Sequence, residues 1–123
     1  MKKKIFIAED NKNSKALFEA VLRLIPEVEL ITERNGKEAL EKIKHIKPDI
    51  IIMDIKLPEI SGIEICKQLK SMKEFQEIKI LAVTAVAMPE EKGKILRAGF
   101  DEYITKPIKI KEFRKIIKQY LNS

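Results

Sequence analysis

The sequence predicts an α/β fold in which a five-stranded parallel sheet is doubly wound, with five helices covering both of its faces. Short apolar segments alternate with longer segments of helical period along the 123 residues. This alternation is typical of a parallel sheet with a helical layer on each side. The short segments are apolar throughout, as expected of strands that are buried on both faces. No linker, repeat or low-complexity stretch interrupts the pattern, so we expect a single domain over residues 1–123.

The first half of the chain supplies three of the strands and two of the helices. We expect strands at 4–8, 28–32 and 50–53, and helices at 14–25 and 36–46. Apolar residues recur at helical spacing in both helices. Pro26 closes the first helix, and Pro48 marks the loop before the third strand.

The second half continues the alternation. We expect strands at 78–83 and 102–105 and helices at 89–98 and 110–121. A further helix is expected after a turn marked by Pro58 and Gly62, and it carries Ile63, Ile65, Cys66 and Leu69. Pro89 suits a first helical position, and Gly99 is a natural stop for the same helix. The last helix has an inner face made of Ile110, Phe113, Ile116, Ile117 and Tyr120.

Composition excludes several classes of function. The net charge is +6, but Lys and Arg are scattered along the chain among acidic residues, and no nucleic-acid-binding motif is present. We therefore expect no direct binding of nucleic acid. No apolar run approaches the roughly 20 residues that cross a bilayer, and the amino-terminal segment lacks the pattern of a signal peptide. A cytoplasmic location without membrane contact is expected.

Two side chains that often carry chemistry each occur once in the chain. Cys66 cannot form an internal disulfide, and its apolar neighbours predict a buried structural thiol. His45 lies near a helix end without a second His or a Cys cluster, which argues against a metal or catalytic role.

Polar residues follow the strands at their carboxyl ends. Glu9 and Asp10 follow the first strand, Asp54 the third, Thr84 the fourth, and Lys106 comes just after the fifth. All these ends lie at one edge of a parallel sheet, where ligands bind in open α/β folds. Each residue alone has an ordinary explanation as a cap, a turn hydroxyl or a surface charge. Their joint occurrence at this edge predicts a site.

The predicted site calls for a cation and suits phosphoryl transfer. Three converging carboxylates repel one another, and Lys106 supplies a single positive charge. Mg²⁺ suits a site with few carboxylates and oxygen ligands. Transfer of a phosphoryl group needs its oxygens neutralised while a nucleophile attacks, and a carboxylate such as Asp54 can be that nucleophile.

The chain resembles the receiver domain of bacterial two-component response regulators over essentially its whole length. The matching stretches are IFIAEDN, PDIIIMDIKLPEISG, AVTA and AGFDEYITKP. The resemblance is strongest to stand-alone regulators of the cell-cycle and sporulation kind, and to receivers attached to hybrid histidine kinases. It implies a flavodoxin-like sheet with strand order 2-1-3-4-5.

The resemblance also implies roles for individual residues. Asp54 would accept the phosphoryl group. Asp10, Asp54 and the backbone carbonyl of Lys56 would bind Mg²⁺, with Glu9 acting directly or through water. Thr84 would hydrogen-bond to one phosphoryl oxygen.

Further family roles fall near the fifth strand. Lys106 would pair with another phosphoryl oxygen, and a cis peptide bond would precede Pro107. Tyr103 would rotate inward behind Thr84 on activation, although it could instead be an edge residue that packs on the last helix.

The expected function is a phosphorylation-dependent switch and not an enzyme. A histidine kinase or histidine phosphotransfer protein would donate the phosphoryl group, and a downstream protein would bind the surface formed by residues 89–98, 102–105 and 110–121. The chain would be a monomer or weak dimer. An alternative is a receiver from a hybrid kinase or a longer regulator, and the initiating Met and clean helical end favour the stand-alone form.

Other phosphoryl-transfer families fit less well. A haloacid-dehalogenase-type phosphatase needs a second Asp two residues after the nucleophile, where this chain has Lys56. The glycine-rich loop of nucleotide triphosphatases is absent, as is the phosphate loop of flavodoxins. A Mg²⁺-dependent phosphatase remains the alternative from another class.

Three finer expectations concern the rate of self-dephosphorylation, the stability of one helix and a basic surface. Lys56 and Val86 would hinder the hydrolytic water and slow self-dephosphorylation. Gly93 would keep its helix malleable. The basic residues on the outer side of the last helix fit a solvated face, with an acidic partner as the alternative.

Overall fold

The computed structural model describes residues 2–85 and 88–122. The elements in chain order are β1 (Lys3–Ala8), α1 (Lys12–Leu22), β2 (Val28–Glu33), α2 (Gly36–Ile46), β3 (Ile50–Asp54), α3 (Gly62–Lys70), the short 3₁₀ helix η1 (Lys73–Phe75), β4 (Lys79–Thr84), α4 (Pro89–Ala98), β5 (Glu102–Thr105) and α5 (Ile110–Leu121). The five strands form one sheet in the order β2-β1-β3-β4-β5, and all neighbouring strands are parallel. The predicted fold class and strand order are confirmed.

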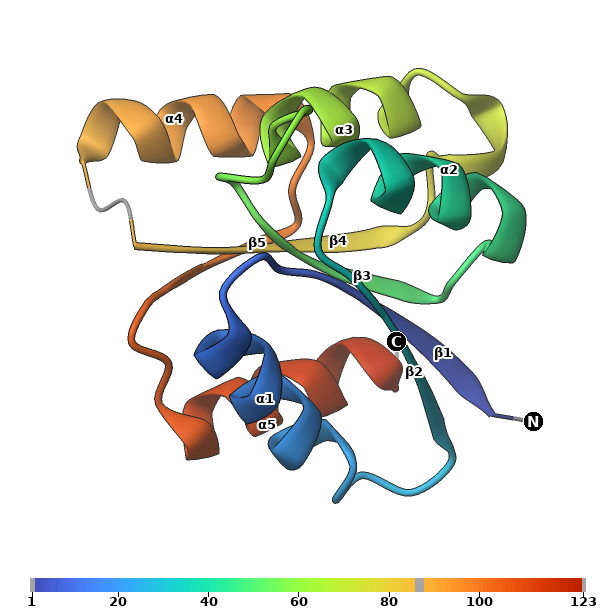
Figure 1. Cartoon of the computed structure of the whole chain (residues 1–123), viewed down its shortest axis with the longest axis vertical. Helices are drawn as coiled ribbons and strands as arrows, with labels where there is room; N and C mark the ends of the chain where they lie inside the picture. The colour runs from blue at the N-terminus through green and yellow to red at the C-terminus, as the bar shows by residue number, and fades with distance from the viewer. Residues whose placement is uncertain (1, 86–87, 123) are drawn as a thin grey trace.

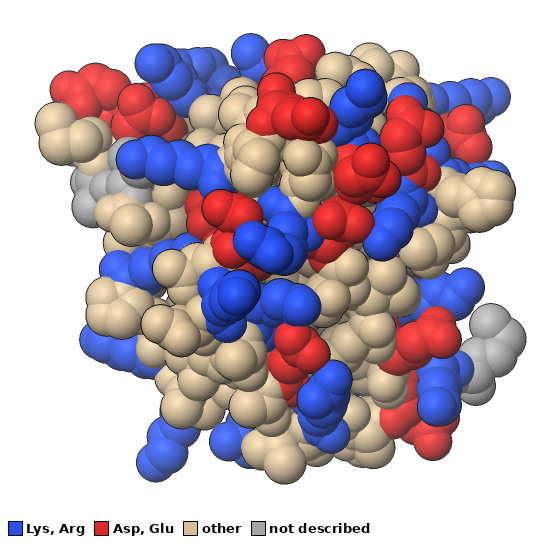
Figure 2. All heavy atoms as spheres, viewed as in Figure 1, with Lys and Arg blue, Asp and Glu red and all other residues tan. Residues whose placement is uncertain are grey.

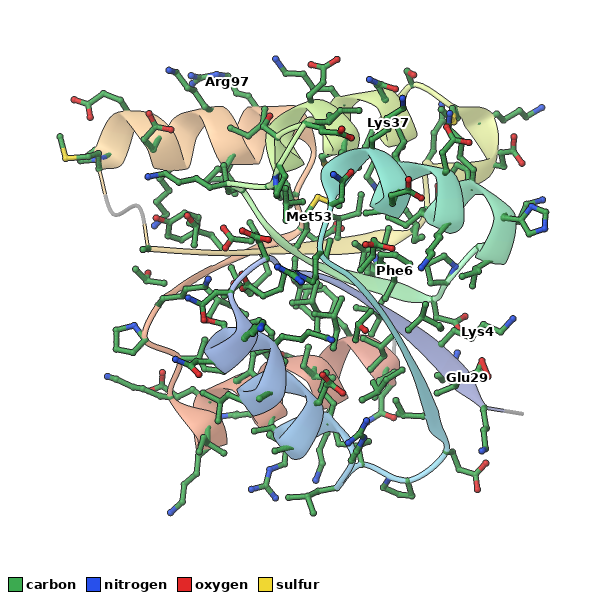
Figure 3. All side chains as sticks on the ribbon, viewed as in Figure 1. Lys4, Phe6, Glu29, Lys37, Met53 and Arg97 are labelled. Carbon is green, nitrogen blue, oxygen red and sulfur yellow. The ribbon has the colours of Figure 1, made fainter. Side chains whose placement is uncertain are left out.

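The sheet separates two helical layers (Figure 1). Helices α2, α3 and α4 cover one face, and α1 and α5 cover the other. Side chains alternate across a strand, so β3 serves both layers: Ile51 and Met53 belong to one buried cluster, and Ile50 and Ile52 to the other. Phe6 and Met53 lie on the side of α2 and α3 in Figure 3.

Helix α1 differs from its prediction at both ends. It begins at Lys12 because the Asn11 side chain caps it, accepting a hydrogen bond of 2.9 Å from the backbone N–H of Ser14. It ends at Leu22 although the apolar period continues, and Leu24 is 69% exposed. The chain then turns through Glu27, whose φ is 63°. The predicted helix over 14–25 was therefore wrong at its boundaries.

The other elements lie close to their predicted positions. Helices α2, α4 and α5 and strand β5 have the predicted bounds, and the remaining strands shift by a residue at one or both ends. The 3₁₀ helix was not predicted because it is too short to show a period. On α5, Phe113 and Ile117 are buried, but Ile110 is 46% exposed and does not belong to the inner face.

The single cysteine of the chain is buried, and its single histidine is exposed. Cys66 is fully buried, its thiol donates to the carbonyl of Ala98 at 3.3 Å, and burial raises the pKa of the thiol to about 12. The prediction of a structural cysteine is confirmed. His45 is exposed at the end of α2. Over the described part of the chain, every helix is too short or too polar to span a membrane.

Candidate functional site at the carboxyl edge of the sheet

The register of the strands brings the predicted site residues to one edge. Asp54 is the last residue of β3 and pairs with Val83 of β4, so Thr84 follows directly beside it. Glu9 follows Ala8, which pairs with Met53 on the other side of β3. These strand ends point toward the left of Figure 1. The central strand therefore places Asp54 between the ends of its two neighbours.

Lys106 connects two carboxylates at this edge. Its Nζ lies 2.8 Å from Asp54 Oδ2 and 2.8 Å from Glu9 Oε1. Glu9 is 1% exposed and Asp54 is 9% exposed. Buried charges persist in proteins when they are paired. The ammonium group thus offsets part of the negative charge that the two strands bring together.

The pKa values of this trio follow from burial and mutual contact. Burial raises the pKa of Glu9, Lys106 lowers it, and the neighbouring Asp54 raises it, with a net increase over the ordinary value. For Lys106, burial opposes the charge, but the hydrogen bonds to Asp54 and Glu9 outweigh it and raise the pKa. The lysine is therefore held as a cation beside Asp54.

Asp10 does not join this cluster. Its side chain is 48% exposed, and its Oδ1 lies 3.9 Å from Nε of Arg34. Among residues 2–85 and 88–122, no group of three or more acidic, histidine or cysteine side chains is arranged to hold a metal. The predicted convergence of three carboxylates is thus incomplete, because Lys106 lies between two of them and the third faces Arg34.

The donor set still fits a hard divalent cation. Glu9, Asp10 and Asp54 offer carboxylate oxygens on adjacent strand ends, and such oxygens are the ligands that Mg²⁺ prefers. Glu9, Asp54 and Lys106 together carry one net negative charge when all are ionised, and Asp10 adds another. A cation at this edge would balance that excess.

The loop after β3 holds Asp54 in place. The backbone N–H of Lys56 donates to Asp54 Oδ1 at 3.1 Å, and the side chain of Lys56 is exposed. At the end of the loop, Gly62 donates its N–H to the carbonyl of Ile55 at 2.8 Å. A Cβ on Gly62 would lie 2.5 Å from the carbonyl oxygen of Asp54. Only glycine therefore fits this approach.

The remaining residues with predicted roles are Thr84, Tyr103 and Pro107. Thr84 is 1% exposed, and its carbonyl accepts a hydrogen bond of 2.8 Å from the N–H of Lys106. Tyr103 is partly buried against the cluster on the α4 side, and Nζ of Lys92 lies 5.9 Å from the centre of its ring. The Lys106–Pro107 peptide bond is cis.

Comparisons with known proteins agree with this geometry. The family model for the response regulator receiver domain matches residues 5–118. The chain belongs to the response regulator receiver family. It is 42% identical over 121 residues to the polar-differentiation response regulator DivK of Brucella anthropi, covering 98% of each chain.

Solved receiver structures give the same fold. The receiver domain of a sensor histidine kinase from Pseudomonas aeruginosa, which has a magnesium ion in its active-site cleft, is 26% identical with a TM-score of 0.90 over 100% of both chains. A receiver domain of a histidine kinase from Syntrophus aciditrophicus is 28% identical with a TM-score of 0.89, over 98% of this chain and 90% of that one. The chain is thus a phosphorylation-dependent receiver of a two-component system, which implies a histidine kinase as phosphodonor.

Two residues of this receiver site were missed from the sequence. No role in the site was predicted for Arg34, yet it is the cation that faces Asp10. The strand order contained the signal, because β2 lies beside β1 and its end therefore approaches Asp10. Gly62 was treated only as turn punctuation, and its contact with Asp54 depends on the path of the loop.

Proposed function

We propose that Asp54 is the residue on which this receiver is phosphorylated. The observation that carries the proposal is the 2.8 Å contact between Asp54 Oδ2 and Nζ of Lys106 at the carboxyl edge of the sheet. A buried carboxylate beside a paired cation, with Thr84 and its hydroxyl on the adjacent strand, supports this role.

The reaction would transfer a phosphoryl group from a phosphohistidine to Asp54. A bond forms between a carboxylate oxygen of Asp54 and phosphorus, while the bond from phosphorus to the histidine nitrogen breaks and that nitrogen keeps the electron pair. Lys106 would pair with one oxygen of the transferred group, and Thr84 would donate a hydrogen bond to another.

The metal ligands would be Asp10, Asp54 and the backbone carbonyl of Lys56, with Glu9 acting directly or through water. A bound Mg²⁺ supplies neutralisation of the phosphoryl oxygens during transfer. In this role Asp10 would turn from Arg34 toward the site. Glu9 would orient Lys106, to which it is already paired.

Phosphorylation would be read through Thr84 and Tyr103. When Thr84 moves toward the phosphoryl group, Tyr103 would rotate inward and leave Lys92. This would alter the surface of α4, β5 and α5, which we propose as the face that a downstream protein binds. The sequence left open whether Tyr103 is instead an edge residue that packs on the last helix. In the structure, Tyr103 packs against the buried cluster on the α4 side.

We propose that the donor is a histidine kinase or a histidine phosphotransfer protein, and that the chain works in the cytoplasm as a monomer or weak dimer. The match to DivK over 98% of both chains supports a stand-alone, single-domain form. The likeness to receivers of histidine kinases favours the alternative of a receiver from a longer chain. Immunoblotting of source cells separates the two by the size of the native polypeptide.

We also propose slow self-dephosphorylation. The exposed Lys56 side chain stands two residues after Asp54 and would hinder an approaching water. Val86, the second residue expected to act in this way, lies outside the described residues. A half-life of seconds that Lys56→Ala leaves unchanged would contradict the proposal.

Incubation with acetyl phosphate and Mg²⁺, read by intact mass, tests the acceptor. We expect a single phosphoryl adduct that Asp54→Asn abolishes and that the matched variant Asp49→Asn, at the opposite edge of the sheet, retains. An adduct that survives Asp54→Asn would disprove the assignment. Turnover of phosphomonoesters by the native chain would instead support a phosphatase.

A further inference from the structure

We propose that the outer side of α5 is a binding site for an acidic segment of a partner protein. Four cations line one surface hollow of about 420 Å³: Lys111, Arg114, Lys115 and Lys118. They follow the spacing i, i+3, i+4 and i+7, which places them on one side of the helix. At 1.5 Å per residue they extend over about 10 Å of its axis. We call this set the α5 basic groove.

The cations of the α5 basic groove are not neutralised within the fold. None of the four forms an ion pair with another residue in the described ranges. At α1, by contrast, Lys15 and the C-cap residue Arg23 lie 3.9 and 2.9 Å from Glu19. The groove is thus a site of uncompensated positive charge.

The single acidic residue of α5 lies on another side of the helix. Glu112 lines a separate pocket together with Tyr103 and Ile116, on the β5 side. Glu112 therefore faces Tyr103 and β5, whereas the α5 basic groove lies on the outer side of the same helix, away from Tyr103. Binding in the groove would accordingly not require phosphorylation of Asp54.

The arrangement is unfavourable for the isolated helix. Like charges at i,i+3 and i,i+4 repel, and the groove contains the pairs Lys111/Lys115 and Arg114/Lys118 among others. Lys111 also lies in the first turn, where the helix dipole disfavours a cation. A pattern that lowers helix stability without a compensating contact in the fold is typical of a functional surface.

Carboxylates fit this groove better than nucleic acid or lipid. Three of its four cations are Lys, and it contains no aromatic or amide side chain that would stack on or read a base. Nucleic-acid binders commonly neutralise about six to ten phosphates, which a groove of about 10 Å cannot reach. Among the described residues of α5, Ile110 is the one exposed large hydrophobic side chain near the groove, and a single such side chain is a weak membrane anchor.

Charge neutralisation of the groove tests the proposal. We would measure the affinity of a fluorescein-labelled octaglutamate peptide at low ionic strength by fluorescence anisotropy. Lys111→Gln, Arg114→Gln, Lys115→Gln and Lys118→Gln combined should weaken binding about tenfold or more. The matched control, Lys12→Gln, Lys37→Gln, Lys67→Gln and Lys73→Gln combined, has the same change in charge and should weaken it no more than about twofold.

The remaining outcomes are decisive in either direction. Equal weakening in both variants, or no binding by the native chain, would overturn the proposal. Tighter groove-dependent binding of a single-stranded oligonucleotide of equal charge, or of phosphatidylserine vesicles, would replace it with a nucleic-acid or membrane site. Binding by Asp54→Asn should equal that of the native chain, which separates this inference from the proposed phosphorylation.

The groove variant should remain folded because its substitutions remove like-charge repulsion. Its midpoint of thermal unfolding should equal or exceed that of the native chain. If the midpoint falls, the double variant Lys115→Gln/Lys118→Gln provides the same test. Figure 2 shows part of this setting: at the lower left, where α5 begins in Figure 1, Lys and Arg atoms occur without Asp or Glu atoms beside them.

Discussion

At the scale of single residues, the site is shaped by which cation each carboxylate faces. Lys106 pairs with Glu9 and Asp54 in the interior, whereas Arg34 faces Asp10 from the surface at 3.9 Å. Both partners of the second pair are about half exposed, so the attraction between them is weak. Arg34 is nevertheless placed to compete with a metal ion for Asp10.

Replacing Arg34 should therefore strengthen metal binding. We expect Arg34→Ala to increase the affinity for Mg²⁺ about two- to fivefold, equivalent to roughly 0.5–1 kcal/mol. Isothermal titration calorimetry measures the affinity. Arg23→Ala removes an equivalent charge from the far end of α1 and should have no effect. An unchanged or weaker affinity in Arg34→Ala would show that Arg34 does not compete with the metal for Asp10.

At the scale of elements, a charge pair joins the end of β2 to α2. Nζ of Lys42 lies 2.8 Å from Oε1 of Glu33, and this hydrogen bond is the main reason why the pKa of Glu33 is below its ordinary value of 4.5. A lowered pKa in the folded state stabilises the fold at pH values above 4.5, and this contribution is lost as the pH falls through the lowered value.

Because of the Lys42–Glu33 ion pair, the effect of replacing Lys42 on the free energy of unfolding should depend on pH. Lys42→Met should lower the free energy of unfolding by about 0.5 kcal/mol at neutral pH, since the exposure of Lys42 keeps the pair weak. The difference from the native chain should shrink on acidification below pH 4.5. Urea denaturation at several pH values measures it. Lys37→Met on the same helix is the control, and a difference that persists in acid would contradict the assignment.

Helix α4 contains a destabilising residue at its centre. A Cβ on Gly93 would meet only the flexible guanidinium of Arg97, at 3.1 Å from Nη1, so the backbone leaves room for alanine. Arg97 lies on the outer side of the helix (Figure 3). Packing therefore does not demand glycine at this position, and its effect on helix stability is the remaining physical consequence.

Substitution of Gly93 should stiffen α4. We expect Gly93→Ala to stabilise the chain by about 0.5–1 kcal/mol. Amide exchange in α4 should slow, and its response to phosphorylation should decrease. Lys94→Ala, at the next residue, should change neither. If Gly93→Ala leaves exchange in α4 unaltered, glycine does not keep this helix malleable.

At the scale of the whole molecule, the sheet divides the interior into two clusters. Ile65 lies in the cluster beneath α2, α3 and α4, and Ile117 lies with the Phe18–Phe113 pair in the other. The backbone of the central strands separates them. Perturbations on one face should therefore have little influence on packing at the other.

A double-mutant cycle tests this separation. Ile65→Val and Ile117→Val should each cost about 0.5–1.5 kcal/mol, and the double variant should equal their sum within about 0.5 kcal/mol. Urea denaturation gives all four free energies. A larger deviation from additivity would mean that the sheet transmits packing changes between the layers.

Patterns along the chain were sufficient to predict the architecture. Pro89 and Gly99 delimit α4 locally, so its predicted bounds are confirmed. The ends of α1 could not be predicted in the same way, because Leu24 and Ile25 continue the apolar period after the helix has stopped. Where a tertiary turn overrides periodicity, the pattern cannot indicate the boundary.

The sequence was sufficient to predict that certain polar residues meet at one edge of the sheet, but not how their side chains are paired there. Strand ends and parallel order bring Glu9, Asp54 and Lys106 to one edge, which the structure places within 2.8 Å contacts. The orientation of Asp10 depends on competition between Arg34 and the interior, and no local pattern encodes that balance. Exposure on α5 was likewise misjudged for Ile110, which follows the apolar period but is 46% exposed at the first residue of the helix.

The division of the interior has an evolutionary consequence. Since each helical layer packs on its own face of the sheet, substitutions can accumulate in α1 and α5 without compensating changes in α2, α3 and α4. A duplicated copy could therefore change the residues of one helical layer while the packing of the other layer stayed as it was. The strands that both layers share would be the slowest part of the chain to diverge.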